Sequence, residues 1–225
     1  MRKAVAVFFL LVAGRGFAAT GALEKGEELF LNNKPAEALP LLEEALNEDP
    51  ANENVYLYLG TADQQLGDYD KAIAVLKKGL AVATLHKDLM YFDMGNDYFS
   101  KGQFTFADQM YSGALDANPA LADALLNRAN ARMKLQSYAD ALSDYTVFLQ
   151  LRPQDSQRPQ IQAVMGLIAQ TMAAQEQQKK DAEAKQKALM NEVMSSLNNA
   201  SEDTKNLSVQ SLQFKDESAD VDIKD

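Results

Sequence analysis

Residues of the same kind recur at intervals of 34, 35 and 34 positions along more than half of this 225-residue chain. Small residues fill two of the recurring columns: Gly26, Gly60, Gly95 and Ala129 in one, and Ala38, Ala72, Ala107 and Ala141 in the other. Because several columns keep one period, we expect a series of similar units, each burying its apolar face against the next.

Large residues and helix-ending residues keep the same period. They are Leu42, Leu76, Tyr111 and Tyr145 in one column, and Pro50, Thr84, Pro119 and Pro153 in another. Small residues let two helices approach closely, and large ones fill the space around the contact. Gly67 and Gly102 are expected to end first helices in the left-handed conformation, and Asp68 to cap the helix that follows.

The period and the residue types resemble tetratricopeptide repeats. The third unit fits that pattern best, at Tyr91, Met94, Gly95, Tyr98, Gly102, Phe104, Ala107, Tyr111, Ala114 and Pro119. The resemblance implies an all-α fold, an α-solenoid of four helix–turn–helix units over residues 19–155, at about 19–52, 53–87, 88–121 and 122–155. Asp63, Gly79 and Arg132 depart from the family's usual residues.

Residues 156–198 are predicted to form a capping and extended C-terminal helix. Its apolar residues Ile161, Val164, Met165, Ile168 and Met172 are expected to cover the open end of the fourth unit. The following stretch, 175–187, is polar and favours a helix with no buried face. Residues 199–225 carry few apolar side chains and are predicted to be an acidic disordered tail.

The first 18 residues read as a secretory signal. Arg2 and Lys3 precede an apolar stretch at 4–14, and small residues around Phe17 allow cleavage after Ala18. This predicts a periplasmic or secreted protein. Arg15 follows the apolar stretch directly, so an uncleaved signal tethering the chain to the inner membrane is the alternative. The chain has no cysteine, so we expect no lipid anchor.

Charge and motifs argue against several classes of function. The formal net charge is −10, and losing the signal with its three basic residues lowers it to −13, so we expect no nucleic-acid partner. The single histidine, His86, falls in a loop between units, and no motif of a phosphate loop, zinc protease or serine hydrolase occurs. We expect no catalytic, cofactor-binding or metal-binding residue and no enzyme activity.

The resemblance implies a concave groove, lined by the first helix of each unit, that binds a peptide or helix of another protein. The matching columns hold Leu57, Tyr58, Thr61 and Gln64, then Phe92, Asp93, Asn96 and Phe99, then Leu126, Asn127, Asn130 and Met133. The partner-binding residues predicted from these are Leu57, Phe92, Asn96, Phe99, Leu126, Asn127, Asn130 and Met133. The alternative is that the asparagines and phenylalanines serve packing between first helices.

The basic clamp with which some family members hold a C-terminal carboxylate is missing. Its columns hold Leu23, Glu27, Tyr58, Leu89 and Asp93.

A second interaction surface is predicted near the end of the C-terminal helix. Leu189, Met190, Val193, Met194 and Leu197 share one helical face beyond the polar stretch. This stripe would bind a partner or a second copy of the chain. Folding back onto the repeats would need a break near Ala188, where no Gly or Pro occurs, and a frayed helix without function is the third interpretation.

These patterns predict a periplasmic scaffold or adaptor for other proteins, with partners of the cell envelope or periplasm. Its overall plan resembles small exported repeat proteins of envelope-assembly or aerotolerance gene clusters. The alternative is an accessory subunit of a solute-transport or envelope enzyme complex.

Overall fold

The computed structural model describes the backbone of residues 21–217 and the side chains of residues 21–205. In this part of the chain all regular structure is helical, which confirms the predicted all-α fold. The helices are α1 (Gly21–Leu31), α2 (Pro35–Glu48), α3 (Glu53–Leu66), α4 (Tyr69–Val82), α5 (Lys87–Ser100), α6 (Phe104–Ala117), α7 (Ala122–Lys134), α8 (Tyr138–Leu151) and α9 (Arg158–Glu217). The predicted signal, residues 1–18, lies outside the described residues, as do residues 218–225.

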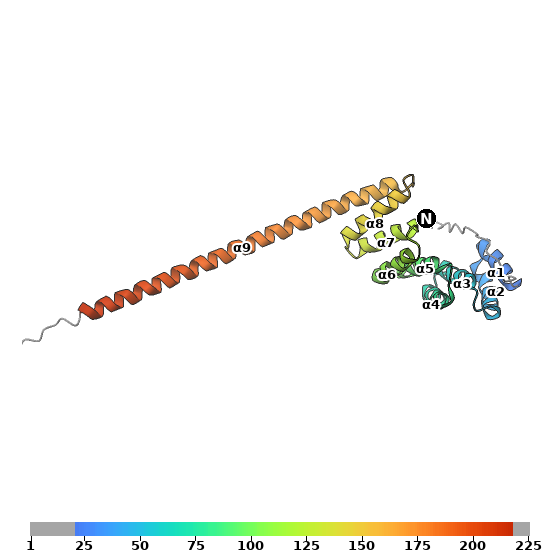
Figure 1. Ribbon diagram of the computed structural model, residues 1–225, viewed down its shortest axis with the longest axis horizontal. Coiled ribbons are helices and arrows are strands. Elements are labelled where there is room, and N and C mark those ends of the chain that lie inside the picture. The colour runs from blue at the N-terminus through green and yellow to red at the C-terminus, as the bar shows by residue number, and fades with distance from the viewer. Residues whose placement is uncertain (1–20, 218–225) are drawn as a thin grey trace, which may run out of the picture. The chain divides into compact units, whose positions relative to one another are not determined.

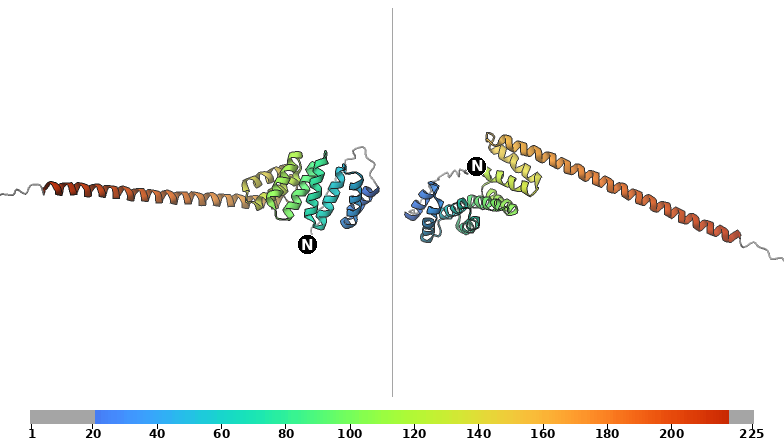
Figure 2. Two further views of the ribbon diagram at one scale, coloured as in Figure 1. Left: turned by 90° about the horizontal axis from the view of Figure 1, so that it is seen from below. Right: turned by 180° about the vertical axis from the view of Figure 1, so that it is seen from behind.

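The first eight helices form four pairs that follow one another in chain order (Figure 1). Within each pair the first helix packs against the second, and the second helix packs against the first helix of the next pair. The first helices α1, α3, α5 and α7 also contact one another in succession (Figure 2). They therefore present a shared surface, which carries the predicted partner-binding residues.

Close helix contact explains the small-residue columns. A Cβ atom added to Gly60 would lie 2.5 Å from Leu76, and one added to Gly95 would lie 2.5 Å from Tyr111. Gly79, which departs from the family's usual alanine, has the same reason, since its added Cβ would lie 2.7 Å from the Cβ of Tyr56. No real Cβ contact is this short, so any larger residue would push the paired helices apart.

The turn inside each unit uses one left-handed residue. Gly67 and Gly102 have φ of 83° and 72°, as the sequence predicts, and Asn33 and Gln136 occupy the same column with φ of 59° and 60°. The predicted cap is wrong, because the side chain of Asp68 makes no capping bond to α4 and instead pairs with Lys71.

An acidic residue in the first turn of α3, α5 and α7 ties that helix to the end of its own unit. Glu53 accepts hydrogen bonds from the backbone N–H groups of Thr84, Leu85 and His86. Burial alone would raise the pKa of Glu53, but these three donors outweigh it and hold the pKa below its ordinary value. The equivalent bonds join Asp88 to Asn118 and Asp123 to Arg152.

The chain divides into two units between Gln162 and Ala163, and α9 passes through this boundary. Of the side chains predicted to cap the repeats, Ile161 and Ile168 are buried, and the other three are half-buried. No break occurs at Ala188, where folding back would require one. None of the helices described, α9 included, is long and apolar enough to cross a membrane.

The helix continues past the predicted boundary at residue 198. It ends at Glu217, so disorder from residue 199 onward is wrong for residues 199–217. No Gly or Pro interrupts this stretch. Extending an existing helix fixes one residue for each hydrogen bond gained, whereas starting a new one is costly, so a polar sequence continues a helix it would not start alone.

Candidate functional site

We call the predicted partner-binding side chains of α3, α5 and α7 the first-helix face. Leu57 does not belong to it, because its side chain is only 1% exposed and packs in a cluster with Tyr56, Leu76 and Met90. This part of the prediction is wrong, since α3 is buried by neighbours on more of its circumference than α5 and α7 are. The remaining members are half-buried: Phe92, Asn96, Phe99, Leu126, Asn127, Asn130 and Met133.

The asparagines of the first-helix face are held by hydrogen bonds to one another and to buried tyrosines. The Oδ1 atom of Asn96 accepts from the Tyr111 hydroxyl and from Nδ2 of Asn127, both at 2.9 Å. The Oδ1 atom of Asn130 accepts from the Tyr145 hydroxyl at 2.6 Å. These bonds link α5 to α6 and α7, and α7 to α8, so each asparagine has a fixed orientation.

Each of these amides also keeps one polar group without a partner among the described residues. Asn96 and Asn130 use only their oxygen, and Asn127 uses only its nitrogen. None of the three free groups is a buried unpaired atom, so solvent reaches them. The face thus presents two amide donors and one amide acceptor in fixed positions, a combination that suits a bound backbone.

The tyrosines under the face act as fixed donors. Burial raises the pKa of Tyr145 to about 12. Burial also raises the pKa of Tyr111, with a smaller contribution from the nearby carboxylates of Asp97 and Asp93. Both hydroxyls therefore stay protonated at neutral pH and keep their asparagine partners in place.

The two phenylalanines of the face contact aromatic rings of α6, the second helix of their own unit. The ring of Phe92 lies 6.0 Å from that of Tyr111, and the ring of Phe99 meets that of Phe104 edge-on at 5.2 Å. Both rings pack against a buried cluster that includes Ala107. Their remaining exposed surface contributes apolar area beside the asparagines.

An acidic pair lies between α3 and α5. Thr61 Oγ1 donates to Oδ2 of Asp93 at 3.5 Å, and Gln64 Nε2 donates to Oδ1 of Asp97 at 2.8 Å. Asp97 is fully buried, and its Oδ2 has no hydrogen-bond partner in the described part of the chain. The sequence placed Asp93 in a groove column and at a position of the missing basic clamp, and it gave no sign that Asp97 is buried.

Burial raises the pKa of both carboxyls in this pair. Burial and then the charge of Asp97 raise the pKa of Asp93 to about 7, against the bond from Thr61. Burial raises the pKa of Asp97 to about 7 as well, and the bond from Gln64 opposes the shift. Near neutral pH the protonated and ionised forms of each carboxyl are therefore both populated.

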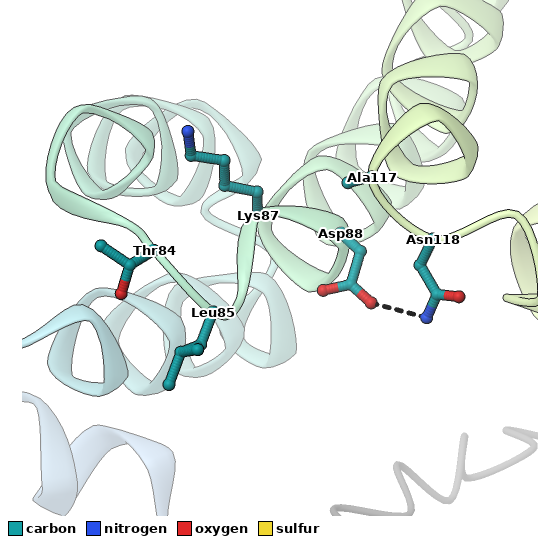
Figure 3. A pocket seen from close by; sticks show the side chains of 6 residues that line it. All are labelled: Thr84, Leu85, Lys87, Asp88, Ala117 and Asn118. Carbon is teal, nitrogen blue, oxygen red and sulfur yellow. Dashed lines mark hydrogen bonds between the residues drawn. The ribbon is translucent and has the colours of Figure 1, made fainter.

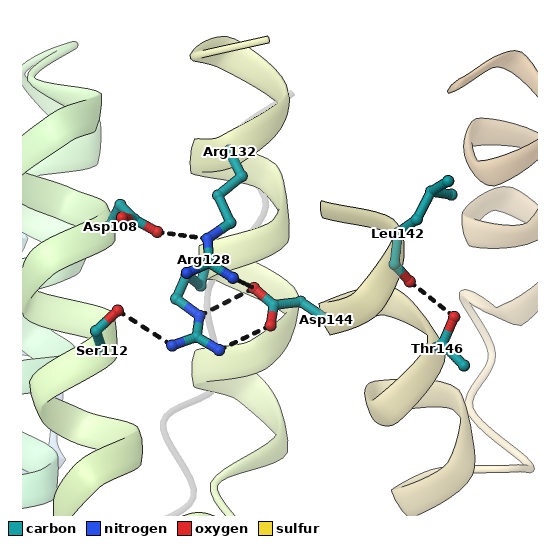
Figure 4. Close-up of polar contacts among 7 residues, drawn as sticks. All are labelled: Asp108, Ser112, Arg128, Arg132, Leu142, Asp144 and Thr146. Atoms are coloured by element: carbon teal, nitrogen blue, oxygen red, sulfur yellow. Dashed lines mark hydrogen bonds and ion pairs between the residues drawn. The ribbon is translucent and has the colours of Figure 1, made fainter. Parts of the chain in front are cut away.

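A network of ion pairs occupies α6, α7 and α8 (Figure 4). Two nitrogens of Arg128 bond to the carboxylate of Asp144 at 2.9 and 2.7 Å, and a third donates to Ser112. Arg132 joins the same carboxylate at 2.8 Å and Asp108 at 2.6 Å. Since Asp144 is buried, the two arginines neutralise it, which explains the unusual Arg132 and makes this cluster a structural one.

A depression of about 460 Å³ lies at the ends of α4 and α6 and the start of α5 (Figure 3). Its two facing polar side chains, Asp88 and Asn118, bond to each other at 2.9 Å. His86 contributes its backbone N–H to Glu53, and no cluster of three metal-binding side chains occurs among the residues described. The depression therefore lies where neighbouring units meet, and its Asp88 and Asn118 side chains are bonded to each other.

The predicted stripe on α9 is fully on the surface. Leu189, Met190, Val193, Met194 and Leu197 are between 46% and 62% exposed. Neighbouring α9 residues from 175 to 205 are exposed too. This surface, the α9 stripe, consists of exposed apolar side chains of one helix.

Comparison with known proteins identifies the repeats. Family models described as "Tetratricopeptide repeat" match residues 29–88 and 92–156. RNA polymerase II-associated protein 3 of Xenopus tropicalis is 34% identical over 91 residues, which are 40% of this chain and 12% of that protein. The chain thus spans about an eighth of that relative's length.

Solved structures of similar fold include a crystal structure of MamA protein, at 19% identity and a TM-score of 0.62, covering 71% of this chain and 85% of that one. A second is MamA from Desulfovibrio magneticus RS-1, at 20% identity and a TM-score of 0.61, covering 70% of this chain and 87% of that one. At such identities the likeness shows the fold alone. With four helix pairs at the predicted period and family models matching across them, this chain belongs to the tetratricopeptide repeat family.

Proposed function

We propose that this protein is an exported scaffold or adaptor that binds a segment of another protein on its first-helix face. The observation that carries the proposal is the row formed by Asn96, Asn127 and Asn130. Each amide is held by hydrogen bonds through one of its two polar groups and leaves the other group open to solvent. Groups fixed before binding lose little conformational freedom when a partner arrives.

The apolar side chains beside this row complete a surface suited to protein. Leu126 and Met133 are half-buried on α7, and the exposed edges of Phe92 and Phe99 lie on α5. A peptide-binding surface combines polar groups, which bind the peptide backbone, with apolar side chains, which contact the peptide's side chains. The relative from Xenopus tropicalis is by its name associated with another protein, which accords with this role.

A matched pair of substitutions tests the binding face. Met133→Glu adds a negative charge on the first-helix face, and Gln109→Glu adds the same charge at an exposed position on α6. In affinity capture from the envelope fraction of the producing cell, we expect Met133→Glu to lose the specific partner and Gln109→Glu to keep it. Equal capture by both variants would remove the proposal. The identity of the captured protein decides between an envelope adaptor and a subunit of a solute-transport or envelope enzyme complex.

The proposed location rests on the N-terminal signal. We expect the mature chain to begin at Ala19 and to fractionate with soluble periplasmic or secreted proteins. Mass spectrometry of the purified native protein reads its first residue. An intact Met1 in a membrane fraction would replace this location with tethering by an uncleaved signal.

A further inference from the structure

Among the residues described, no positively charged side chain bonds to the acidic pair Asp93–Asp97. Asp97 is fully buried, and only its Oδ1 is bonded, to Gln64. Asp93, one helical turn earlier on α5, accepts from the Thr61 hydroxyl at the long distance of 3.5 Å. A buried carboxylate oxygen without a donor is a costly arrangement that proteins rarely keep without a use.

The charged and titratable groups around the pair do not neutralise it. From α3 comes Asp63, a third buried acid, and from α6 comes the protonated hydroxyl of Tyr111. Lys101 is the cation that acts on Asp97, yet its ammonium group is bound to Asp70. The site therefore gathers acidic groups between two first helices, and no described cation bonds to either carboxyl of the pair.

Asp144, another buried acid, is neutralised within the chain. Asp144 is equally buried, but Arg128 and Arg132 satisfy both of its oxygens. In that cluster the chain supplies its own guanidinium groups. In the Asp93–Asp97 pair the same need is left open, although the pair lies on the helices that carry the first-helix face.

We propose that Asp93 and Asp97 form a subsite for a cationic side chain, a lysine ammonium or an arginine guanidinium, of the protein segment bound on the first-helix face. This inference rests on the proposed function and specifies the partner's chemistry. Asp93 is half-buried and meets the incoming cation first, and a bond to the buried Oδ2 of Asp97 requires local rearrangement around it. Charge-assisted hydrogen bonds then replace the missing donor.

Protonation of the pair competes with the cation. Both carboxyls have a pKa raised to about 7, so the pair holds protons below neutral pH and is negatively charged above it. A bound cation favours the charged form and therefore releases protons. Affinity for a basic segment is expected to rise as the pH is raised from about 5.5 to about 8.

Nuclear magnetic resonance with small probes tests the subsite on the full chain without a known partner. The probes are N-acetyl-lysine N-methylamide and N-acetyl-norleucine N-methylamide, which lacks the ammonium group. At about pH 8 we expect the lysine probe alone to shift the amide signals of Thr61, Gln64, Asp93 and Asp97 in a saturable way. Its apparent affinity should fall on the order of tenfold at about pH 5.5 as the carboxyls take up protons.

Two matched variants complete the test. Asp93→Asn with Asp97→Asn should abolish the shifts, whereas Asp116→Asn with Asp140→Asn removes the same charge from exposed positions and should leave them. Three results would each overturn the subsite. They are equal shifts with both probes, no saturable shift at about pH 8, and shifts that survive in the Asp93 and Asp97 variant. If the double variant does not fold, the pH dependence of the unchanged chain decides. If the subsite is overturned but Met133→Glu still loses the captured partner, the proposed function stands without the cationic subsite.

Discussion

The first-helix face and the α9 stripe are both candidate interaction surfaces, yet they are built in opposite ways. On the first-helix face, side chains from several helices fix one another, as Asn127 and Tyr111 do with Asn96. On the α9 stripe, apolar side chains of a single helix are about half exposed. The polar groups of the first-helix face are oriented before any partner arrives, whereas the side chains of the α9 stripe would be ordered only by a partner.

This difference predicts where the chain tolerates change. The repeats are close-packed through small residues, so substitutions there should lower stability. Described side chains of α9 from 175 to 205 are exposed, so equivalent substitutions there should act on association alone.

Among substitutions, the largest effect on stability is expected where the same change is placed in both regions. Ala107 is fully buried beside Tyr111, so Ala107→Leu should overpack the contact between α5 and α6 and cost on the order of 1–3 kcal/mol in the free energy of unfolding. Ala188 on α9 is exposed, so Ala188→Leu should cost nothing measurable. Urea denaturation followed by circular dichroism compares the two variants. Equal stability would contradict close packing at Ala107.

The second effect is a pH dependence that belongs to the repeats alone. Asp93 and Asp97 have folded pKa values raised to about 7, so between their unfolded values and about 7 the folded chain binds more protons than the unfolded chain. The free energy of unfolding should therefore fall as pH rises from about 5 to about 8, by roughly 2–3 kcal/mol for each carboxyl. Glu53 stays ionised through this window because its pKa is lowered.

Asp97→Asn should weaken this dependence, since one of the two titrating carboxyls is replaced by an amide while Asp93 still titrates. Thermal unfolding at the two ends of the pH range measures it, with Asp116→Asn as the control. If the free energy of unfolding of the unchanged chain instead rises between about pH 5 and about pH 8, both carboxyls are charged and held by cations, contrary to the structure.

A smaller gain is expected at the turns of the first and last units. Gln136 adopts the left-handed conformation that Gly67 and Gly102 adopt in the same column. A residue with a side chain is strained there by about 1 kcal/mol, so Gln136→Gly should stabilise the repeats by roughly 0.5–1 kcal/mol. Gln136→Ala is the control, because alanine keeps the strain. A loss of stability with glycine would mean that the Gln136 side chain makes an unrecognised contribution.

The smallest effect on stability is predicted for the α9 stripe. Leu189→Ser, Val193→Ser and Met194→Ser together should leave the unfolding of the repeats unchanged, because these side chains are exposed. They should abolish any self-association or partner binding that depends on burying this apolar area. Analytical ultracentrifugation and affinity capture measure both. Association that survives the triple change would show that the stripe is not an interaction site.

The period of the sequence was enough to predict the architecture. Because one helix-pair geometry repeats, the column of Gly60 and Gly95 identifies the close contacts with Leu76 and Tyr111 without any further information. The same reasoning placed the asparagines on the first helices. It did not reveal their bonds to the tyrosines, which depend on the depth of each side chain between two helices.

The remaining features depend on neighbours from several helices. Asp97 has the same residue type as many exposed acids, and only the packing of α3 against α5 buries it. Arg128 and Asp144 lie 16 positions apart and meet only once α7 and α8 pair. Gln136 is left-handed because the fold repeats the turn whatever residue occupies it. The prediction for Leu57 was wrong because a repeat position indicates the direction of a side chain but not which neighbours cover it.

Site-specific photo-crosslinking in the producing cell tests most directly that the first-helix face holds another protein. A photoreactive benzoylphenylalanine would replace Met133 on the face, Val193 on the α9 stripe and Gln109 on α6, one position at a time. We predict that Met133 gives a discrete adduct with another protein and that Gln109 gives none, while Val193 shows independently whether the stripe has a partner. An adduct from Gln109 equal to that from Met133, or none from Met133 while the protein is in complex, would contradict binding at the first-helix face.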